Sequence, residues 1–333
     1  MIIGLGSMGK RRIRNLLHLG FSNIYGFDLR KDRREEAEKK YEIRTFDTFE
    51  NAINDTKFDA FVISLPPILH NQFIESSIEL GIPCFVEVNV ILEGLEKLEN
   101  KAKRQQILVA PSSTMNFHPA VKFIKDTIKS KKLGEISNIM YHSGQYLPDW
   151  HPYEKVSDFY VSNPITGGAR EIVPFELTWL CSIFGMPLKV AGMFKKTISI
   201  DGAELIDDTY NCMFDFDGYF LTMTIDVVSR KARRLLVING DSGQLIWDWN
   251  QKKVVIHKNE TLTEEFNFEV MESHAGYNKN ITEEMYIKEM EAFIYAAFEN
   301  EIYPNSLTED IKILQLLNAL ETSYKTNSFV NLS

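Results

Sequence analysis

The chain has 333 residues, of which 44% are hydrophobic and 25% charged, a composition typical of a globular protein whose length favours two domains. A net charge of −9 argues against nucleic acid as the main partner, and no apolar run approaches the roughly 18 residues of a membrane span. Three widely separated cysteines indicate a reducing, cytoplasmic compartment and no metal cluster.

Residues 1–112 alternate short apolar runs with helical patterns, as a parallel sheet with helices on both faces requires. The predicted strands span residues 1–3, 23–28, 60–63, 84–86 and 107–110. The predicted helices span residues 10–19, 31–41, 49–53, 71–80 and 94–104. We therefore expect a Rossmann-type, doubly wound α/β domain that binds its ligand beyond the carboxyl ends of the strands.

A G-x-G-x-x-G motif, formed by Gly4, Gly6 and Gly9, lies between the first strand and the first helix. Here Gly4 permits a tight turn, Gly6 lets the backbone approach a pyrophosphate, and Gly9 allows the helix to pack close to the strand. Ser7 and Met8 lie at the start of the helix, whose N-terminal N–H groups favour bound phosphates. The motif predicts dinucleotide binding, and the alternative is a glycine turn in a doubly wound fold without a dinucleotide.

The kind of dinucleotide is indicated by Asp28, which ends the second predicted strand. A carboxylate about 20 residues after the glycine motif accepts from a ribose 2′-hydroxyl and repels a 2′-phosphate, so Asp28 favours NAD. Arg30 can instead stack on adenine or pair with a 2′-phosphate, as can Arg33 or Arg34, and NADP therefore stays open as the alternative.

A basic run from Lys10 to Arg14 follows the glycines. We expect this run to form a solvated face of the helix. The alternative is that it adds positive potential near the pyrophosphate.

Residues 113–333 have a different pattern, which predicts an α+β domain with a large, mainly antiparallel sheet for substrate binding and oligomerisation. Apolar and polar residues alternate in several runs between residues 188 and 257, separated by turn signals. The other predicted elements are helices at 119–131, 171–184, 282–299 and 308–322, a strand at 136–143 and a loop at 145–153. Since an open antiparallel sheet often pairs with a second subunit, we expect a homodimer or homotetramer formed through it.

Further motifs follow the glycine loop and Asp28 in a recognisable order. They are Ser64-Leu65-Pro66-Pro67-Ile68-Leu69-His70, Glu87-Val88-Asn89, Asn116-Phe117-His118-Pro119 and Gly167-Gly168-Ala169-Arg170-Glu171. With these motifs the chain resembles, over nearly its whole length, the Gfo/Idh/MocA family (glucose–fructose oxidoreductase, inositol dehydrogenase and MocA) of NAD(P)-dependent sugar oxidoreductases. The run Tyr146-Leu147-Pro148-Asp149-Trp150-His151-Pro152 is similar to that of members from surface-polysaccharide sugar pathways.

The resemblance implies how the cofactor residues are used. Ser64, Leu65 and Pro66 would line the nicotinamide side of the site. His70 would help to position that loop, or would make a purely structural hydrogen bond at the start of its helix. Glu87 would contact the ribose or nicotinamide end.

Two positions depart from the family pattern, and both concern the proton of the reacting hydroxyl. The family usually has Glu-Lys-Pro where this chain has Glu87-Val88-Asn89, and the lysine commonly donates to the substrate hydroxyl. The family's acid/base histidine and a nearby aspartate correspond to Phe175 and Ile172. Because neither Val88 nor Phe175 can transfer a proton, we expect an atypical proton relay.

Polar side chains near these positions are candidates to replace the missing groups. Imidazole has an ordinary pKa of roughly 6.5 and suits a general base, so we expect His151 to be catalytic, together with Glu171 beside the lost aspartate position. The expected substrate contacts, which would bind hydroxyls, carboxylates or phosphates or stack on a sugar ring, are Tyr146, Asp149, Trp150, Arg170 and Glu176. Alternatively, Trp150 only packs its loop and Glu171 caps its helix.

These expectations support three functions. The first is an NAD(P)-dependent oxidoreductase that transfers a hydride between the nicotinamide and a hydroxyl or keto group of a sugar or nucleotide sugar. The second is a dinucleotide-binding protein without redox turnover, and the third is a lyase or hydrolase that uses NAD for transient oxidation. Retention of the three glycines, Asp28 and Glu87 favours the first, because a decayed site would also lose its cofactor residues.

Overall fold

The structure is a computed structural model that describes residues 1–152, 154–258, 262–269, 271 and 282–332. Tyr153, the last residue of the predicted loop, lies outside the described part. The chain forms two compact units, each built from two stretches of sequence. Unit 1 contains Met1–Thr114 and Met285–Lys312, and unit 2 contains Met115–Glu284 and Ile313–Ser333. The predicted boundary after residue 112 assigned residues 285–312 to the second domain, whereas they belong to unit 1.

Unit 1 contains a six-stranded, fully parallel sheet with the strand order β3-β2-β1-β4-β5-β6. Its strands are β1 (Ile2–Ile3), β2 (Tyr25–Phe27), β3 (Arg44–Phe46), β4 (Phe61–Ile63), β5 (Cys84–Val86) and β6 (Val109–Pro111). Its helices are α1 (Ser7–His18), α2 (Lys31–Tyr41), α3 (Phe49–Asp55), α4 (His70–Leu80), α5 (Leu95–Gln105), most of α8 (Glu283–Phe298) and the first turns of α9 (Leu307–Thr326). The predicted doubly wound fold is confirmed.

The two faces of this sheet are both buried, which explains the continuous apolar runs of its strands. Val62 in β4 belongs to a core cluster that includes Ile13 of α1 and Phe293 of α8. The adjacent Phe61 points to the other face, where its ring lies 5.7 Å from that of Phe49 in α3. Phe293 also packs 5.9 Å from Phe85 in β5, so α8 is part of the core of unit 1 despite its distance in sequence.

Unit 2 contains a nine-stranded sheet with the strand order β14-β13-β12-β11-β7-β10-β9-β8-β15. Its strands are β7 (Ile136–Tyr146), β8 (Lys189–Lys195), β9 (Thr209–Phe216), β10 (Tyr219–Asp226), β11 (Val228–Gly240), β12 (Gln244–Asp248), β13 (Lys253–His257), β14 (Leu262–Asn267) and β15 (Val330–Asn331). The central pair β7 and β10 is parallel and the other pairs are antiparallel. The predicted, mainly antiparallel sheet is therefore confirmed.

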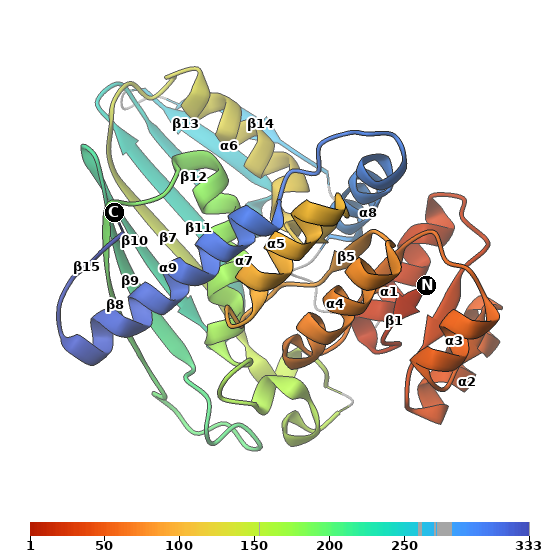
Figure 1. Cartoon of the computed structure of the whole chain (residues 1–333). Coiled ribbons are helices and arrows are strands. Elements are labelled where there is room, and N and C mark those ends of the chain that lie inside the picture. Colours follow the sequence, from red (N-terminus) through yellow and green to blue (C-terminus); the bar gives the residue numbers. More distant parts are fainter. Residues whose placement is uncertain (153, 259–261, 270, 272–281, 333) are drawn as a thin grey trace. The chain divides into compact units, whose positions relative to one another are not determined.

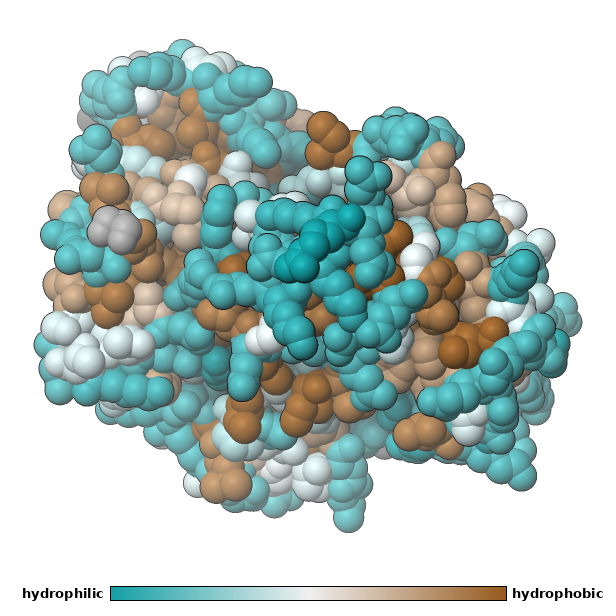
Figure 2. All heavy atoms as spheres, in the orientation of Figure 1, coloured by the Kyte–Doolittle hydropathy of each residue, from teal (hydrophilic) through white to brown (hydrophobic). Residues whose placement is uncertain are grey.

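One face of this sheet is covered by α6 (Pro119–Lys129), α7 (Ala169–Phe184) and the part of α9 that belongs to unit 2 (Figure 1). The described residues also form short 3₁₀ segments: η1 (Pro67–Leu69), η2 (Thr114–Phe117), η3 (Leu147–Asp149), η4 (Val156–Asp158), η5 (Tyr160–Ser162) and η6 (Trp249–Gln251). In the view of Figure 2, hydrophobic residues are interspersed with hydrophilic ones at the surface, as is ordinary for globular proteins.

Candidate functional site

The glycine loop between β1 and α1 is tightly packed at two of its three glycines. Gly4 has a φ of +95°, and a Cβ built there would lie 2.6 Å from the carbonyl oxygen of Ser64. A Cβ built at Gly9 would lie 1.8 Å from the carbonyl oxygen of Gly4. Only glycine therefore allows this turn and this close approach of α1 to β1.

Gly6 differs because the protein backbone does not itself require a glycine there. Among the described residues, only the Arg33 guanidinium lies within 4 Å of a Cβ built at Gly6, at an ordinary contact distance of 3.6 Å. Gly6 is also the N-cap of α1, which has no side-chain cap and no acidic residue in its first turn, where Ser7 and Met8 lie. This bare backbone at a helix N-terminus fits the pyrophosphate of a dinucleotide.

Asp28 follows β2, and backbone N–H groups hold its carboxylate. Oδ2 accepts from the N–H of Leu5, in the glycine loop, at 2.8 Å, and Oδ1 accepts from the N–H of Arg30 at 2.8 Å. Asp28 is only 6% exposed, so its orientation is fixed at the edge of the loop. This arrangement fits a carboxylate that receives ribose hydroxyls, and it also makes Asp28 a support of the glycine loop.

Three arginines near Asp28 take different positions. Arg30 forms an exposed ion pair with Asp32. Arg34 donates to the carbonyl oxygen of Asp28 at 2.8 Å. The Arg33 guanidinium lies 3.6 Å from Asp28 Oδ2 and beside the glycine loop. The Arg33 guanidinium thus lies beside both Asp28 and the glycine loop, whereas the predicted cofactor contact was Arg30, with Arg33 and Arg34 as alternatives.

The loop after β4, formed by Ser64, Leu65 and Pro66, is held by a buried histidine. His70 begins α4 and is 1% exposed. Its Nε2 lies 2.9 Å from the carbonyl oxygen of Leu65, which accepts from it, and its Nδ1 lies 2.8 Å from the side chain of Asn89. The first contact is the one that a loop-positioning histidine would make.

Glu87 follows β5 and belongs to a buried network of charges. Arg12 donates from Nε to Glu87 at 2.7 Å and from Nη2 to Glu289 of α8 at 2.8 Å. Burial opposes the charge of Arg12, but the carboxylates of Glu87 and Glu289 raise its pKa, so it is a permanent cation. We expected the basic run to be solvated, and this prediction is wrong for Arg11 and Arg12, which are 1% and 0% exposed. The sequence could not reveal the burial of Arg12, because the carboxylates that pair with it lie far away along the chain.

Glu289 was not recognised from the sequence, although it forms the second half of this network. It is fully buried and accepts from the N–H of Ser113 at 2.6 Å and from the hydroxyls of Ser112 and Thr114 at 3.0 and 2.8 Å. Burial raises its pKa, and Arg12 opposes that effect. Nothing in the sequence singles it out, because α8 also contains Glu283, Glu284 and Glu291.

The two predicted catalytic residues, His151 and Glu171, border the same segment of unit 2. The hydroxyl of Tyr160 donates to Glu171 at the start of α7. The ring of His151 packs edge-on against Phe159, with 4.3 Å between centroids, and Phe159 packs against Tyr160 at 4.7 Å. The structure therefore brings His151 and Glu171 to opposite ends of a Phe159–Tyr160 pair. Tyr160 itself carried no sequence signal beyond its aromatic surroundings.

Among the predicted substrate contacts, Tyr146, Asp149 and Trp150 lie close together at the end of β7 and in the segment that follows. Asp149 is exposed and Trp150 is half-buried. The Arg230 guanidinium lies 3.7 Å from the centre of the Tyr146 ring. All three lie within five residues of His151 in the sequence.

The other two predicted substrate contacts, Arg170 and Glu176, take part in ion pairs inside unit 2. Arg170 donates from Nε to Glu321 at 2.6 Å, which ties the start of α7 to α9. Glu176 is 0% exposed and accepts from Tyr141 at 2.6 Å and Arg234 at 2.9 Å, with further donors in Ser143 and Trp179. Such a carboxylate fastens α7 to the sheet, and it has no exposed surface for a substrate.

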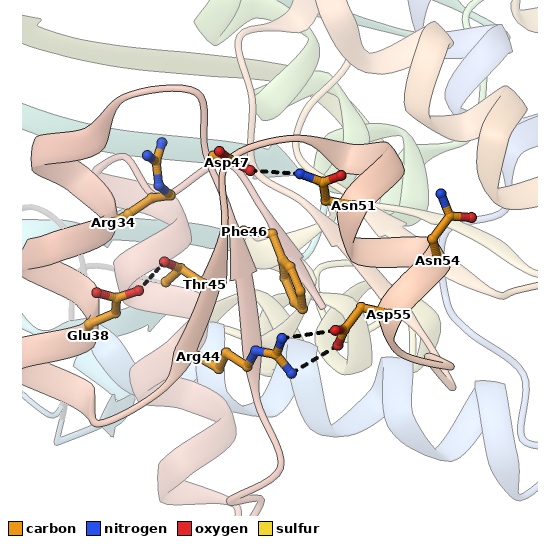
Figure 3. A pocket seen from close by; sticks show the side chains of 9 residues that line it. All are labelled: Arg34, Glu38, Arg44, Thr45, Phe46, Asp47, Asn51, Asn54 and Asp55. Atoms are coloured by element: carbon orange, nitrogen blue, oxygen red, sulfur yellow. Dashed lines mark hydrogen bonds and ion pairs between the residues drawn. The ribbon is translucent and has the colours of Figure 1, made fainter.

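A cavity of about 640 Å³ lies elsewhere in unit 1, beside the edge strand β3. Its lining residues are Arg34, Glu38, Arg44, Thr45, Phe46, Asp47, Asn51, Asn54 and Asp55 (Figure 3). Arg44 pairs with Asp55, and Asn51 donates to Asp47, so polar groups of the cavity satisfy one another (Figure 3). Of the residues predicted to contact the cofactor, only Arg34, an alternative to Arg30, is among this lining, and we do not assign the cavity to the dinucleotide.

Within the described part of the chain, no cluster of three or more histidine, cysteine or acidic side chains has the arrangement of a metal site. No described helix has the length and apolar character that crossing a membrane would require.

Comparison with known families matches two stretches of the chain. Residues 1–112 match the oxidoreductase family with an NAD-binding Rossmann fold, GFO_IDH_MocA. Residues 121–246 match the GFO/IDH/MocA C-terminal domain. No curated protein matches the sequence.

Many solved structures share the fold of the whole chain. A levoglucosan dehydrogenase in complex with NADH superposes with a TM-score of 0.83 at 16% identity and covers 100% of this chain and 98% of its own. A myo-inositol 2-dehydrogenase from Lactobacillus plantarum gives a TM-score of 0.81 at 15% identity, with 100% and 98% covered. An Agrobacterium radiobacter oxidoreductase in complex with NAD⁺, L-tartaric acid and magnesium gives 0.82 at 12% identity, with 99% and 97% covered.

Proposed function

Because the chain belongs to the Gfo/Idh/MocA family of NAD-binding oxidoreductases, we propose that it transfers a hydride between NAD and a hydroxyl or keto group of a sugar or nucleotide sugar. The observation that carries this proposal is the glycine loop, where Gly6 leaves the backbone bare at the N-terminus of α1 beside a fixed Asp28. Similarity to dehydrogenases of levoglucosan and myo-inositol supports a small polyhydroxylated substrate.

Unit 1 contains the residues that would hold NAD, which when bound supplies the centre that accepts or releases the hydride. The backbone of Gly6, Ser7 and Met8 would bind the pyrophosphate, and Asp28 would accept from ribose hydroxyls. Ser64, Leu65 and Pro66 would line the nicotinamide, held by His70. Glu87 would contact the ribose or nicotinamide end, kept in place by Arg12.

Unit 2 would supply the groups that bind the substrate and handle its proton. We assign the general base to Glu171, since the Tyr160 hydroxyl donates to it and a proton can pass along this hydrogen bond. His151 is the alternative base at the other end of the Phe159–Tyr160 pair. Tyr146, Asp149 and Trp150 would bind sugar hydroxyls and stack on the ring. Arg170 and Glu176 do not enter this proposal, because ion pairs inside unit 2 occupy them.

We also propose a substrate class and a cellular compartment for the reaction. The likeness of residues 146–152 to a run found in surface-polysaccharide enzymes supports a nucleotide sugar from such a pathway as the substrate. No disulfide joins Cys84, Cys181 and Cys212, which supports a reducing, cytoplasmic location. Fractionation of the cell, followed by detection of the chain, tests that location.

The proposal also includes self-association through the open face of the nine-stranded sheet. Met140, Met193, Met213 and Phe220 lie on that face and are each more than half exposed. Apolar side chains on an open sheet support a homodimer or homotetramer formed there. Light scattering should show an oligomer that Phe220→Lys dissociates, and a monomeric wild type would contradict this part of the proposal.

The reaction is tested with purified protein, NAD or NADH, and a panel of sugars and nucleotide sugars, followed by the near-ultraviolet absorbance of NADH. We expect turnover with at least one substrate and a loss of kcat, with NADH binding retained, in Glu171→Gln. If the same loss occurred only in His151→Asn, the base would be His151. NADH binding without turnover on any substrate would favour a binding protein. Turnover without net NADH would favour a lyase or hydrolase.

A further inference from the structure

Behind the loop after β4 lies a row of three buried polar side chains that the proposed reaction does not use directly. His70 of α4, Asn89 after β5 and Asp310 of α9 are 1%, 2% and 3% exposed, and all belong to unit 1. His70 Nδ1 lies 2.8 Å from Oδ1 of the Asn89 amide, and Nδ2 of that amide donates to Asp310 Oδ2 at 2.7 Å. On its far side His70 Nε2 lies 2.9 Å from the carbonyl oxygen of Leu65.

The hydrogen-bonding roles in this row are coupled, because each group limits its neighbour. A carbonyl oxygen can only accept, so Nε2 of His70 carries a proton. With the oxygen of the Asn89 amide facing Nδ1, as in the structure, His70 must be doubly protonated and the NH₂ group donates to an ionised Asp310. The oxygen and nitrogen of an amide have nearly the same shape, so the amide fits equally when turned over: its NH₂ group then donates to a neutral His70, and its oxygen accepts from a protonated Asp310. Both arrangements satisfy every contact and have the same total charge.

Burial distinguishes the two arrangements, because it penalises every charge that they contain. It lowers the pKa of His70, against the opposing effects of Asn89, Leu65 and the nearby charge of Glu87. The charge of Glu87 is itself compensated by Arg12. Burial also raises the pKa of Asp310 to about 7, against the hydrogen bond from Asn89. Both shifts favour the neutral arrangement.

We propose that Asn89, with its amide turned over, and a protonated Asp310 are positioning residues that hold His70 as its neutral Nε2–H tautomer and thereby fix the loop of Ser64, Leu65 and Pro66. That this loop orders the nicotinamide end of NAD rests on the proposed function, whereas the protonation state of His70 can be established without it. Asn89 stands where the Glu-Lys-Pro pattern has a proline, which offers no side-chain amide. The row is therefore a feature of this chain and links residue 65 to residue 310 through three side chains.

The test combines ¹⁵N NMR of histidine in the full-length protein with NADH titrations, and His70→Gln identifies the His70 signals. We expect one protonated and one unprotonated ring nitrogen for His70 in the wild type at about pH 7. Asp310→Asn should keep this pattern, because the amide can donate to Asn89 as the protonated acid does, and NADH affinity should stay within about twofold. Asp310→Ala and Asn89→Ala should each weaken NADH binding about fivefold, as expected for the loss of one buried hydrogen bond.

Asn89→Asp provides the opposite perturbation, because a carboxylate against Nδ1 should protonate both nitrogens of His70. Asn305→Ala is the matched control: Asn305 is equally buried in unit 1 but donates to Pro111, so His70 signals and NADH affinity should not change. Two protonated nitrogens on wild-type His70, or a His70 signal unaffected by Asn89→Asp, would overturn the proposal. If the wild type failed to bind NADH, the proposed function would be contradicted. The ¹⁵N signals of His70 would still show whether His70 is neutral, and so would still test this inference.

Discussion

Replacing Asp310 by asparagine should change how the free energy of unfolding depends on pH. Burial raises the pKa of Asp310 from 3.8 to about 7, against the opposing hydrogen bond from Asn89. An acid with a raised pKa in the folded state keeps its proton there while the unfolded chain releases it. Its contribution to stability is therefore complete below the unfolded pKa and is lost as the pH rises through the folded pKa. The variant has no such proton, so the wild type should lose stability relative to Asp310→Asn between pH 5 and pH 8.

The magnitude follows from the two pKa values of Asp310. Across this interval the unfolded carboxyl is ionised, whereas the folded one stays protonated until the pH nears about 7. At about 1.4 kcal/mol per pH unit, the stability difference between wild type and variant should shift by about 2.5 kcal/mol. Because Asp310→Asn keeps a donor toward Asn89, the proposed neutral state of His70 is the same in both proteins, and its own contribution cancels from the difference.

Urea unfolding followed by circular dichroism at the two pH values measures this shift. Circular dichroism follows the helices and strands of both units, whereas Trp150, Trp179, Trp247 and Trp249 all lie in unit 2 and Asp310 lies in unit 1. Asn305→Ala, which removes a buried group that does not titrate, should differ from wild type by the same amount at both pH values. A constant difference between wild type and Asp310→Asn would refute the reasoning, as would a wild type that gains relative stability with pH.

Three further predictions concern the glycine loop and its surroundings. Asp28→Ala should weaken NADH binding more than any other single change at the ribose end, because it removes both the acceptor and a support of the loop; unchanged affinity in a titration would remove our assignment of Asp28. Arg33→Ala should lower affinity for NADPH more than for NADH, since its guanidinium lies 3.6 Å from Asp28, and equal losses would exclude a role at the 2′-position. Gly9→Ala should lower Tm and abolish NADH binding, because its Cβ would lie 1.8 Å from the Gly4 carbonyl oxygen; wild-type binding would show that α1 can move without consequence.

The fold of unit 1 was predictable because its strands are buried on both faces and read as short apolar runs. β3 was the exception, since of Arg44, Thr45 and Phe46 only Phe46 is buried. Edge strands have one side without a neighbour, and their sequences are less constrained by burial. The sheet of unit 2 was predictable from alternation, because one of its faces packs against helices and the other is exposed. Tyr141, for example, is 3% exposed, and the preceding Met140 is 51% exposed.

The candidate site was predictable only where a residue's role is local. Gly4 and Gly9 are required by contacts within the loop and with the neighbouring strand, and a spacing rule captures both. The burial of Arg12 depends on Glu87 and Glu289, which lie far along the chain, so a count of nearby charges gave the wrong environment. The role of Asp310 was not predictable for the same reason, because its contact with Asn89 joins residues far apart in sequence.

These long-range contacts converge on the turn after β5, on either side of Val88. Glu87 is held by Arg12, which Glu289 of α8 also binds, and Asn89 is held by Asp310 of α9. Residues 285–312 therefore anchor both neighbours of a position that carries no proton-transferring group. A turn supported this firmly by buried carboxylates is built to fix geometry, which agrees with a cofactor-holding role for it and with a proton acceptor elsewhere. Proton transfer, which we assign to Glu171, and cofactor binding, which we assign to the turn, would then depend on different residues. Substitutions of Glu87 or Asn89 should alter NADH affinity, whereas Glu171→Gln should alter kcat.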